Sequence, residues 1–360
     1  MFSERTSVGL DVHARSVVAC GIDTVTGELL RSRLTPGGAD VLDWITRLPG
    51  PVAVAYEAGP TGFGLARALR AAGLRCEVVA PSKLARPAGD RVKTDARDAL
   101  HLARLLHLDE FTTVRVPSVA EEDARDLVRA REDVRGELMR ARHRVSKLLL
   151  RRGILYSDGK TWTGRHHAWL AAQRFAAAPV QAAYDAALEA VVMAEDRRAR
   201  LDAAIAVLAR DPAWSPVVAR LGCLRGIDTL TALGLAVEIG DWQRFTGASI
   251  AAYLGLVPSE SSSGESRAQG SITKTGNTHA RRLLVEAAWH HRPGYRPGVS
   301  LRHRWDQASP AARARGHAGN QRLNQRWQAF TTHHKRPVIA NVAIARELAG
   351  WCWSLATLPD

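Results

Sequence analysis

Four carboxylates stand where they could act together on a metal ion. Asp11 follows the apolar run SVGL, and Glu57 follows the apolar run VAVAY. Asp95 and Asp98 are three residues apart in KTDARDAL, so on a helix their side chains share one face. A carboxylate at a strand end costs little if it faces a cleft. The spacing therefore favours two strand ends and one helix face that converge on a single point.

Carboxylates in close contact repel one another, which raises some of their pKa values unless divalent cations neutralise them. Hard oxygen ligands select Mg²⁺ or Mn²⁺, and two such ions can align an in-line attack on a phosphodiester. Taken singly, each residue has a simpler interpretation. Asp11 could cap a turn, Glu57 could pair with an arginine, and Asp95 could be a helix N-cap. Their order along the chain is what favours a shared metal site.

The elements that must position these carboxylates form an α/β pattern. Three strands in quick succession are predicted at residues 6–13, 15–23 and 27–34, then helix 41–48, strand 51–57, helix 62–72 and strand 75–80. Three antiparallel strands followed by alternating helices and strands indicate a mixed sheet with helices. With the helix of Asp95 added, this order is that of the RNase H-like nucleases.

From Val119 the sequence changes to long, charged helix. Apolar residues at coiled-coil spacing form one seam: Leu127, Val134, Leu138, Ala141, Val145 and Leu148. A second amphipathic helix carries Tyr184, Leu188, Val191, Leu201, Ile205 and Leu208. Between them, SDGKTWTG suits a turn that joins two antiparallel arms. Two interpretations remain open, an internal helical hairpin and an oligomerising coiled coil.

Length and composition suggest more than one domain. The 360 residues are 46% hydrophobic, enough for a sizeable core, and we expect parts at 1–118, 119–212 and 213–360, the last two mainly helical. No apolar run of eighteen residues and no leader are evident, so a cytoplasmic protein with no membrane partner is expected. The four scattered cysteines indicate buried thiols rather than a zinc site or disulfides: Cys20, Cys76, Cys223 and Cys352.

The positive charge is concentrated near the C-terminus. The formal net charge is +14, and residues 261–360 hold fifteen Lys or Arg against five Asp or Glu. Such a field attracts polyanions, so both nucleic acid and a merely solvated basic surface remain open as explanations. Trp305 and Trp327 lie among arginines; stacking on unpaired bases is conceivable, but core packing is the favoured interpretation.

A second nucleic-acid signal lies at residues 221–242. Two helix-like stretches flank a glycine turn that contains Arg225 and Gly226. In a helix-hairpin-helix, backbone N–H groups of such a turn hold a DNA phosphate without reading sequence. A helical pair inside a core needs the same turn, so both interpretations stand.

Five motifs occur in order along the chain: GLDVH, AYEAGP, KTDARDA, YLGLVPSESSSG and GSITKTGNTHARRLLVEAAW. They resemble those of the DEDD-type transposases of bacterial insertion sequences, a family described as RNA-guided bridge recombinases. The resemblance runs through nearly the whole chain. It implies a RuvC-like N-terminal domain whose acidic set binds catalytic Mg²⁺, and motif by motif that set falls on Asp11, Glu57, Asp95 and Asp98.

The resemblance also implies a C-terminal transposase domain with a nucleophilic serine, which we place at Ser263. Ser262, Ser271 and Thr273 are the alternatives, and a flexible Ser/Gly-rich loop is the simpler interpretation. A serine that attacks a phosphodiester forms a covalent phosphoserine and conserves the bond energy. The residues after this segment could hold phosphates, backbone or bases: Lys274, Asn277, Arg281 and Arg282.

The expected function is a site-specific DNA transposase or recombinase, nucleoid-associated in a bacterial cytoplasm. The resemblance implies DNA and a structured guide RNA as partners, and a dimer or tetramer in which serine and carboxylates meet across protomers. A Holliday-junction resolvase-like nuclease would use the same acidic domain with water as nucleophile. A non-catalytic nucleic-acid scaffold with structural carboxylates is the third hypothesis.

Overall fold

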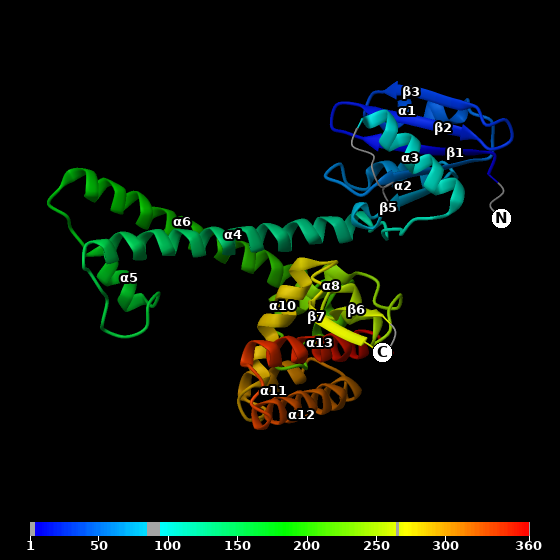
Figure 1. Cartoon of the computed structure of the whole chain (residues 1–360). Helices are drawn as coiled ribbons and strands as arrows, with labels where there is room; N and C mark the ends of the chain where they lie inside the picture. Colours follow the sequence, from blue (N-terminus) through cyan, green and yellow to red (C-terminus); the bar gives the residue numbers. More distant parts are fainter. Residues whose placement is uncertain (1–3, 85–93, 264–265, 360) are drawn as a thin grey trace. The chain divides into compact units, whose positions relative to one another are not determined.

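The computed structural model describes residues 4–84, 94–263 and 266–359, and the side chains of residues 263, 266 and 267 are outside that description. The chain folds into two compact units, Met1–Ser118 and Val119–Asp360. The first unit is an α/β domain and the second is mostly helical, as the sequence predicts (Figure 1).

A five-stranded sheet of order β3-β2-β1-β4-β5 forms the centre of the first unit. Its strands are β1 (Thr6–Val12), β2 (Val17–Asp23), β3 (Leu29–Leu34), β4 (Val52–Glu57) and β5 (Arg75–Val79). The pairs β1–β2 and β2–β3 are antiparallel, whereas β1–β4 and β4–β5 are parallel. This is the mixed sheet predicted from the sequence, with the order expected of an RNase H-like domain.

Helices cover both faces of this sheet. They are α1 (Gly38–Thr46), α2 (Gly64–Ala71) and α3 (Asp95–Leu108), with the short 3-10 helix η1 (Pro81–Lys83). Because side chains alternate along a strand, Leu10 and Tyr56 enter the core with α1 and α2, while Ala55 packs with Leu102 and Leu106 of α3. Successive residues of β1 and β4 therefore face different helices.

Gly9 decides how closely α3 approaches β1. A Cβ at Gly9 would lie 2.0 Å from the Ala99 carbonyl oxygen and 2.5 Å from the Ala103 nitrogen. Only glycine tolerates this distance, because any larger residue would collide with the helix backbone. The odd-numbered residues of β1 therefore face α3.

A long helical hairpin begins the second unit. It consists of α4 (Val119–Arg151) and α6 (Ala178–Leu208), with α5 (Gly164–Ala171) at the tip. Within the chain the two long helices pair through Arg131–Asp202 at 2.7 Å and Arg142–Glu195 at 2.6 Å. The internal hairpin is therefore formed.

The predicted seam of α4 is correct from Val134 to Val145 and shifts by one residue at each end. Val128 and Leu149 are buried, where the sequence pattern favoured Leu127 and Leu148. At the C-terminal end this shift is the drift expected when a straight helix has 3.6 rather than 3.5 residues per turn. At the other end Val128 packs into a different core, that of the helical domain, so another side of the helix is buried there.

The remainder of the second unit is a helical domain with one small sheet. Its elements are α7 (Ser215–Leu221), α8 (Thr229–Ile239), α9 (Ser249–Tyr253), β6 (Pro258–Ser263), β7 (Ser266–Ile272), α10 (Thr278–Ala288), η2 (Trp289–His291), α11 (Val299–Trp305), α12 (Pro310–Thr332) and α13 (Pro337–Ala356). The strands β6 and β7 pair antiparallel. The serine-rich segment is therefore a pair of strands over residues 258–263 and 266–272, and its interpretation as a flexible loop is wrong for these residues.

The tryptophans flagged among the arginines belong to the core. Trp327 is 2% exposed and its indole N–H donates to the Ala288 carbonyl at 3.2 Å, while Trp305 donates to the Cys223 carbonyl at 3.1 Å. All four cysteines are free and buried. Among residues 4–84, 94–263 and 266–359, no helix has the length and apolarity that a membrane crossing requires.

Candidate active site

Asp11 and Glu57 lie at the same edge of the sheet. In the parallel register of β1 and β4, Leu10 stands opposite Tyr56, so the next residues along the two strands are Asp11 and Glu57. Leu10 and Tyr56 point toward α1 and α2. Because side chains alternate along a strand, Asp11 and Glu57 point to the other side of the sheet, toward α3. Asp11 and Glu57 are both half-buried, as expected at an edge that opens to solvent.

The first turn of α3 brings the other two carboxylates to this edge. Thr94 caps the helix, because its hydroxyl oxygen accepts a hydrogen bond from the Arg97 backbone N–H at 3.3 Å. Asp95 and Asp98 follow in the first turn, where negative charge also suits the helix dipole. The N-cap interpretation of Asp95 is wrong by one residue, since Thr94 occupies that position.

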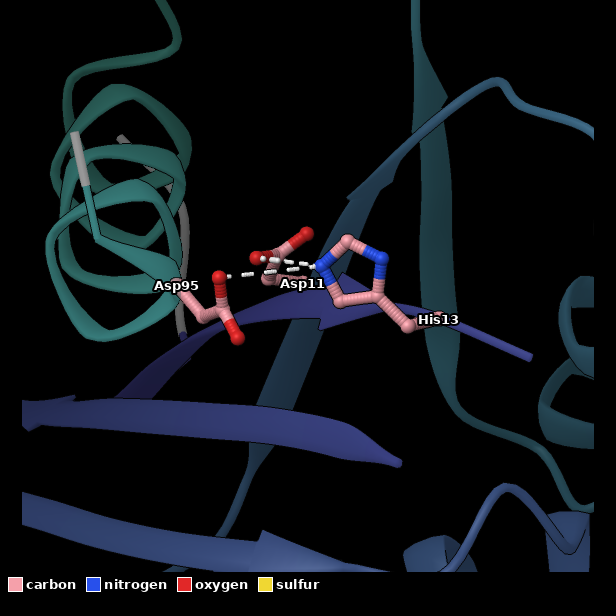
Figure 2. Close-up of side chains that lie close together, drawn as sticks. All are labelled: Asp11, His13 and Asp95. Carbon is pink, nitrogen blue, oxygen red and sulfur yellow. Dashed lines mark hydrogen bonds and ion pairs between the residues drawn. The ribbon is translucent and has the colours of Figure 1, made fainter. Parts of the chain in front are cut away.

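Asp11 and Asp95 meet through His13, which links the strand end to the helix (Figure 2). The His13 Nε2 lies 3.1 Å from an Asp11 oxygen and 3.8 Å from an Asp95 oxygen. One ligand atom from each of the three lies within 4.8 Å of the others, a spacing that a metal ion can bridge. Within the described part of the chain, the group that meets this spacing does not include Asp98 or Glu57.

His13 is the residue that the sequence analysis missed. It comes two residues after Asp11, and side chains two apart along an extended chain point to the same face. The backbone N–H of His13 donates to the Ser16 carbonyl at 2.9 Å, so the tight turn after β1 keeps the ring near that carboxylate. In the motif GLDVH, the two-residue spacing of Asp11 and His13 indicates that their side chains lie on the same side of the chain.

Partial burial raises the pKa of the Asp11 carboxyl, and the nearby charges of Asp95 and Asp98 raise it further, against the opposing effect of His13. Asp98 therefore acts on Asp11 through its charge. Carboxylates that repel one another at an open edge are the donor set that Mg²⁺ or Mn²⁺ prefers. The residues present fit a hard divalent cation.

The strands β6 and β7 form a hairpin over residues 258–272, which we call the serine hairpin. The hydroxyl of Ser259 donates to the Ser271 carbonyl at 3.1 Å, and the hydroxyl of Ser262 donates to a Glu260 oxygen at 3.0 Å. Ser263 ends β6 opposite Ser266, and its side chain lies outside the described side chains. A predicted nucleophile would thus sit at the far end of an antiparallel ribbon.

Comparison with known proteins identifies the family. One transposase model matches residues 8–152, and a model described as the transposase IS116/IS110/IS902 family matches residues 218–300. Putative transposase y4qE of Sinorhizobium fredii is 40% identical over 304 residues, which cover 84% of this chain and 74% of the relative. The chain belongs to the IS110 family of transposases. This confirms the resemblance to DEDD-type transposases, a class of enzymes that cut and rejoin DNA.

Two further relatives support this IS110-family assignment. The transposase for insertion sequence element IS1533 of Leptospira borgpetersenii is 31% identical over 296 residues, covering 80% of this chain and 86% of the relative. A probable family 20 transposase of Pseudomonas aeruginosa is 32% identical over 291 residues, covering 78% of this chain and 82% of the relative.

In this IS110-family chain, the segment after the serine hairpin makes mostly internal contacts. Asn277 caps α10 by accepting from the Ala280 N–H at 2.9 Å, and Arg281 donates to the Leu254 and Thr275 carbonyls at 2.9 and 2.7 Å. Arg282 pairs with Glu132 and Glu286, while Lys274 is exposed. Nucleic-acid binding by these four residues stays a prediction, and Lys274 is the one whose side chain is exposed.

The glycine turn between α7 and α8 is likewise packed against its own domain. The Arg225 N–H donates to Asn320 at 2.8 Å, and its guanidinium donates to the Pro293 carbonyl at 3.0 Å. A Cβ at Gly226 would lie 2.5 Å from the Ala287 carbonyl oxygen. These contacts account for the turn as a packing feature, and its phosphate role stays a prediction.

Proposed function

We propose that this transposase is site-specific and cuts DNA with a divalent cation held by Asp11, Glu57, Asp95 and Asp98. The observation that carries the proposal is the meeting of Asp11, His13 and Asp95 at the sheet edge. Glu57 follows in register on the same face, and Asp98 is close enough to raise the pKa of Asp11. Together these residues place negative charge where a cation and a phosphodiester can share a site.

A bound Mg²⁺ or Mn²⁺ would stabilise the charge that develops on the phosphodiester oxygens. The residues of the chain have the task of holding and orienting the carboxylates. His13 fixes the Asp11 carboxylate by its hydrogen bond, and the Thr94 cap fixes the first turn from which Asp95 projects. The sheet and helix thus preorganise the site.

We further propose that Ser263 is the nucleophile. Its hydroxyl oxygen would lose its proton and form a bond to phosphorus while the bond from phosphorus to one DNA oxygen breaks, and that DNA oxygen takes up a proton and leaves as a hydroxyl. A hydroxyl from a second strand would then attack the phosphoserine, reform a phosphodiester and release the serine. The hydrogen bond that the Ser262 hydroxyl donates to Glu260 weighs against Ser262, the neighbouring candidate.

Guide RNA and oligomer formation complete the proposal. The carboxylates and the serine hairpin belong to different compact units of the chain, which agrees with a dimer or tetramer that joins them across protomers. The fifteen Lys or Arg among residues 261–360 supply positive charge for DNA and for a structured RNA. Base pairing with the RNA would select the DNA site, so no sequence-reading code is required in the protein.

The test uses duplex DNA that carries the element junctions, RNA transcribed from the flanking noncoding DNA, and Mg²⁺. Asp11→Ala and Asp98→Ala should lose strand cleavage by at least about a thousandfold, equivalent to roughly 4 kcal/mol of lost charge stabilisation, and should keep nucleic-acid binding. Ser263→Ala should lose a covalent protein–DNA adduct. Undiminished recombination in the Asp variants would end the proposal for the carboxylates. A free 5′ phosphate made by active Ser263→Ala would favour the nuclease that uses water.

A further inference from the structure

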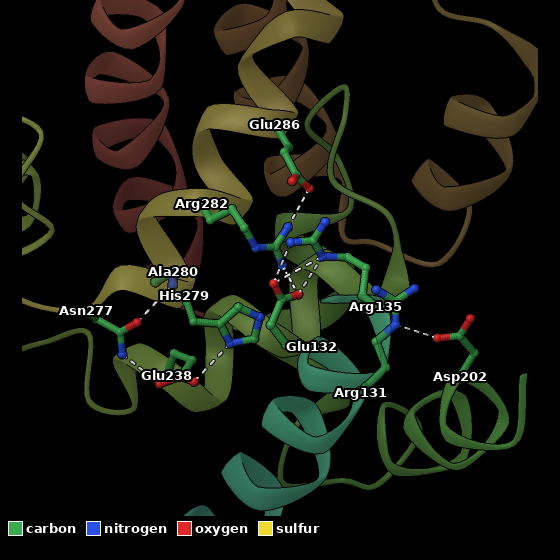
Figure 3. A network of polar contacts seen from close by, with 10 residues as sticks. All are labelled: Arg131, Glu132, Arg135, Asp202, Glu238, Asn277, His279, Ala280, Arg282 and Glu286. Atoms are coloured by element: carbon green, nitrogen blue, oxygen red, sulfur yellow. Dashed lines mark hydrogen bonds and ion pairs between the residues drawn. The ribbon is translucent and has the colours of Figure 1, made fainter. Parts of the chain in front are cut away.

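Glu238, at the end of α8, is a carboxylate sealed inside the second unit. Its side chain is 0% exposed. Arg129 of α4 donates two hydrogen bonds to it at 2.9 and 2.8 Å. Asn277 Nδ2 donates at 2.6 Å, and His279 Nδ1 lies at 3.0 Å (Figure 3). One carboxylate thus joins α4, α8 and the beginning of α10.

The ionised state of Glu238 depends on these partners. Burial opposes ionisation, but the hydrogen bonds from Arg129, His279 and Asn277 outweigh it and hold the pKa of Glu238 well below its usual range. Charge-assisted hydrogen bonds are short and directional, and a bidentate arginine fixes the plane of the carboxylate. The geometry of this cluster is therefore stiff.

Asn277 connects the cluster to the serine hairpin. Its amide nitrogen donates to Glu238, while its amide oxygen accepts from the Ala280 N–H and caps α10. The side chain is therefore held at both ends. The residue follows β7 by a short loop, so its position sets where the second strand of the hairpin leaves the helical domain.

The first strand is tied to the same point. Arg281 bridges the Leu254 carbonyl before β6 and the Thr275 carbonyl after β7. Gly276, at φ +71°, lies so close to the Tyr253 carbonyl oxygen that a Cβ would be 1.9 Å from it. Both legs of the serine hairpin therefore rest on the beginning of α10, which Glu238 holds.

We propose that Glu238 is a positioning residue for the serine hairpin, acting through Asn277 and braced by Arg129. This inference rests on the proposed role of Ser263. Reacting atoms must be held close and aligned, and a displacement of about 1 Å costs on the order of a hundredfold in rate. Loosening the base of a two-stranded ribbon would produce such displacements at its tip without removing any group that contacts DNA.

The first test is Glu238→Gln in the full-length protein, with the junction DNA, RNA and Mg²⁺ described above. The amide has nearly the same size but presents an N–H₂ group where Arg129 and Asn277 both donate. The rate of covalent adduct formation should fall roughly 10- to 100-fold, while the Kd for DNA changes by less than about twofold. Glu286→Gln is the matched control, because Glu286 lies on α10, is 56% exposed and pairs with Arg282. It should react at the wild-type rate.

A reversed pair provides the rescue. In Glu238→Gln with Asn277→Asp, the amide can donate to the new carboxylate, which restores one negative charge and still caps α10. The adduct rate should recover by at least the square root of the lost factor, which is about tenfold if Glu238→Gln lowers the rate about 100-fold. If Glu238→Gln does not fold, as judged by circular dichroism, Arg129→Lys tests the same point more gently. It keeps the charge and loses the bidentate contact, so it should slow adduct formation while DNA binding persists.

Three results would overturn the inference: a wild-type adduct rate in the folded Glu238→Gln protein, or in Arg129→Lys where that variant replaces it; a loss of rate fully explained by weaker DNA binding; or no recovery in the reversed pair. The proposed function fails differently. If Ser263→Ala still forms the adduct, the nucleophile lies elsewhere, whatever the Glu238 variants do.

Discussion

The carboxylates around Asp11 and the carboxylate of Glu238 differ in their surroundings. Asp11 is 20% exposed and Asp95 is 51% exposed, and the charges of Asp95 and Asp98 raise the pKa of Asp11. Glu238 is fully buried among N–H donors that lower its pKa. Both clusters join elements distant in sequence, but like charges meet in one and opposite charges in the other.

The difference shows what each cluster is suited to do. Repulsion among the Asp11 carboxylates weakens the fold until a cation neutralises them, which is the usual relation between stability and function at an active site. The Glu238 cluster gains its stability from within the chain and needs no ligand. Variants in the two clusters should therefore affect stability, cation response and pH response in opposite ways.

The largest expected difference is in folding stability. Glu238→Ala leaves the Arg129 guanidinium without its carboxylate and should lower the free energy of unfolding of the second unit by about 3–5 kcal/mol. Asp11→Asn removes repulsion and should leave the stability of the metal-free first unit unchanged or slightly higher. Urea unfolding followed by tryptophan fluorescence reports mainly the second unit, since nine of the ten tryptophans follow residue 118; backbone circular dichroism covers both. Equal losses in the two variants would contradict the comparison.

The next effect is stabilisation by the cation. Mg²⁺ at one hundred times its Kd should stabilise the first unit by about 2.7 kcal/mol relative to EDTA. This gain should disappear in Asp11→Asn and in Asp95→Asn, and should persist in Glu238→Gln. Differential scanning calorimetry of all four proteins measures it. A full Mg²⁺ response in Asp11→Asn would show that the ion binds elsewhere.

The pH dependence should have opposite sign in the two clusters. The pKa of Glu238 is lower in the folded state, so its contribution to stability is present above the ordinary glutamate pKa of about 4.3 and is lost as pH falls below it. The pKa of Asp11 is raised, so its contribution is present below the ordinary aspartate pKa of about 3.9 and is lost as pH rises through the folded value.

Unfolding of wild type, Glu238→Gln and Asp11→Asn from pH 3 to 7, without metal, measures this difference. In acid, wild type loses the stability that ionised Glu238 supplies, so Glu238→Gln should become less destabilised relative to wild type. Acid also protonates Asp11 in wild type and removes its repulsion, so any stability advantage of Asp11→Asn over wild type should become smaller. Burial lowers the pKa of His291 to about 3, which adds acid sensitivity to all three proteins and cancels in the comparison. A deficit of Glu238→Gln that grows in acid would be inconsistent with the buried anion.

The smallest effects concern the helix caps near each cluster. Thr94 caps α3 and Asp228 caps α8 through hydrogen bonds from Arg97 and Thr231, so Thr94→Ala and Asp228→Ala should each cost about 1 kcal/mol. Only Thr94→Ala should also weaken Mg²⁺ binding, because the first turn of α3 carries Asp95. Thermal melts with and without Mg²⁺ separate the two results. Equal Mg²⁺ affinity in wild type and Thr94→Ala would mean that the cap does not order the site.

Much of the first unit was predictable because its pattern is local. Apolar runs within 6–13 and 51–57 located two strands, and each carries a carboxylate at its last or next-to-last residue. His13 is not predictable in the same way, because it lies beyond the strand, in a turn whose hydrogen bond to Ser16 is a feature of the folded chain. In the second unit, arginines and Asn277 were assigned to nucleic acid from their place after the serine-rich segment, and the structure places most of them in internal contacts.

The sequence by itself determined the order of elements, the strand ends that carry Asp11 and Glu57, and the helix face shared by Asp95 and Asp98, because these follow from periodicities among neighbouring residues. Only the tertiary structure decided that α3 packs on the Gly9 face of β1, and that Glu238 receives its hydrogen bonds from residues 109 positions before it and 39 positions after it. A contact between distant segments depends on how whole elements pack, and no local pattern records which buried charge will meet which donor.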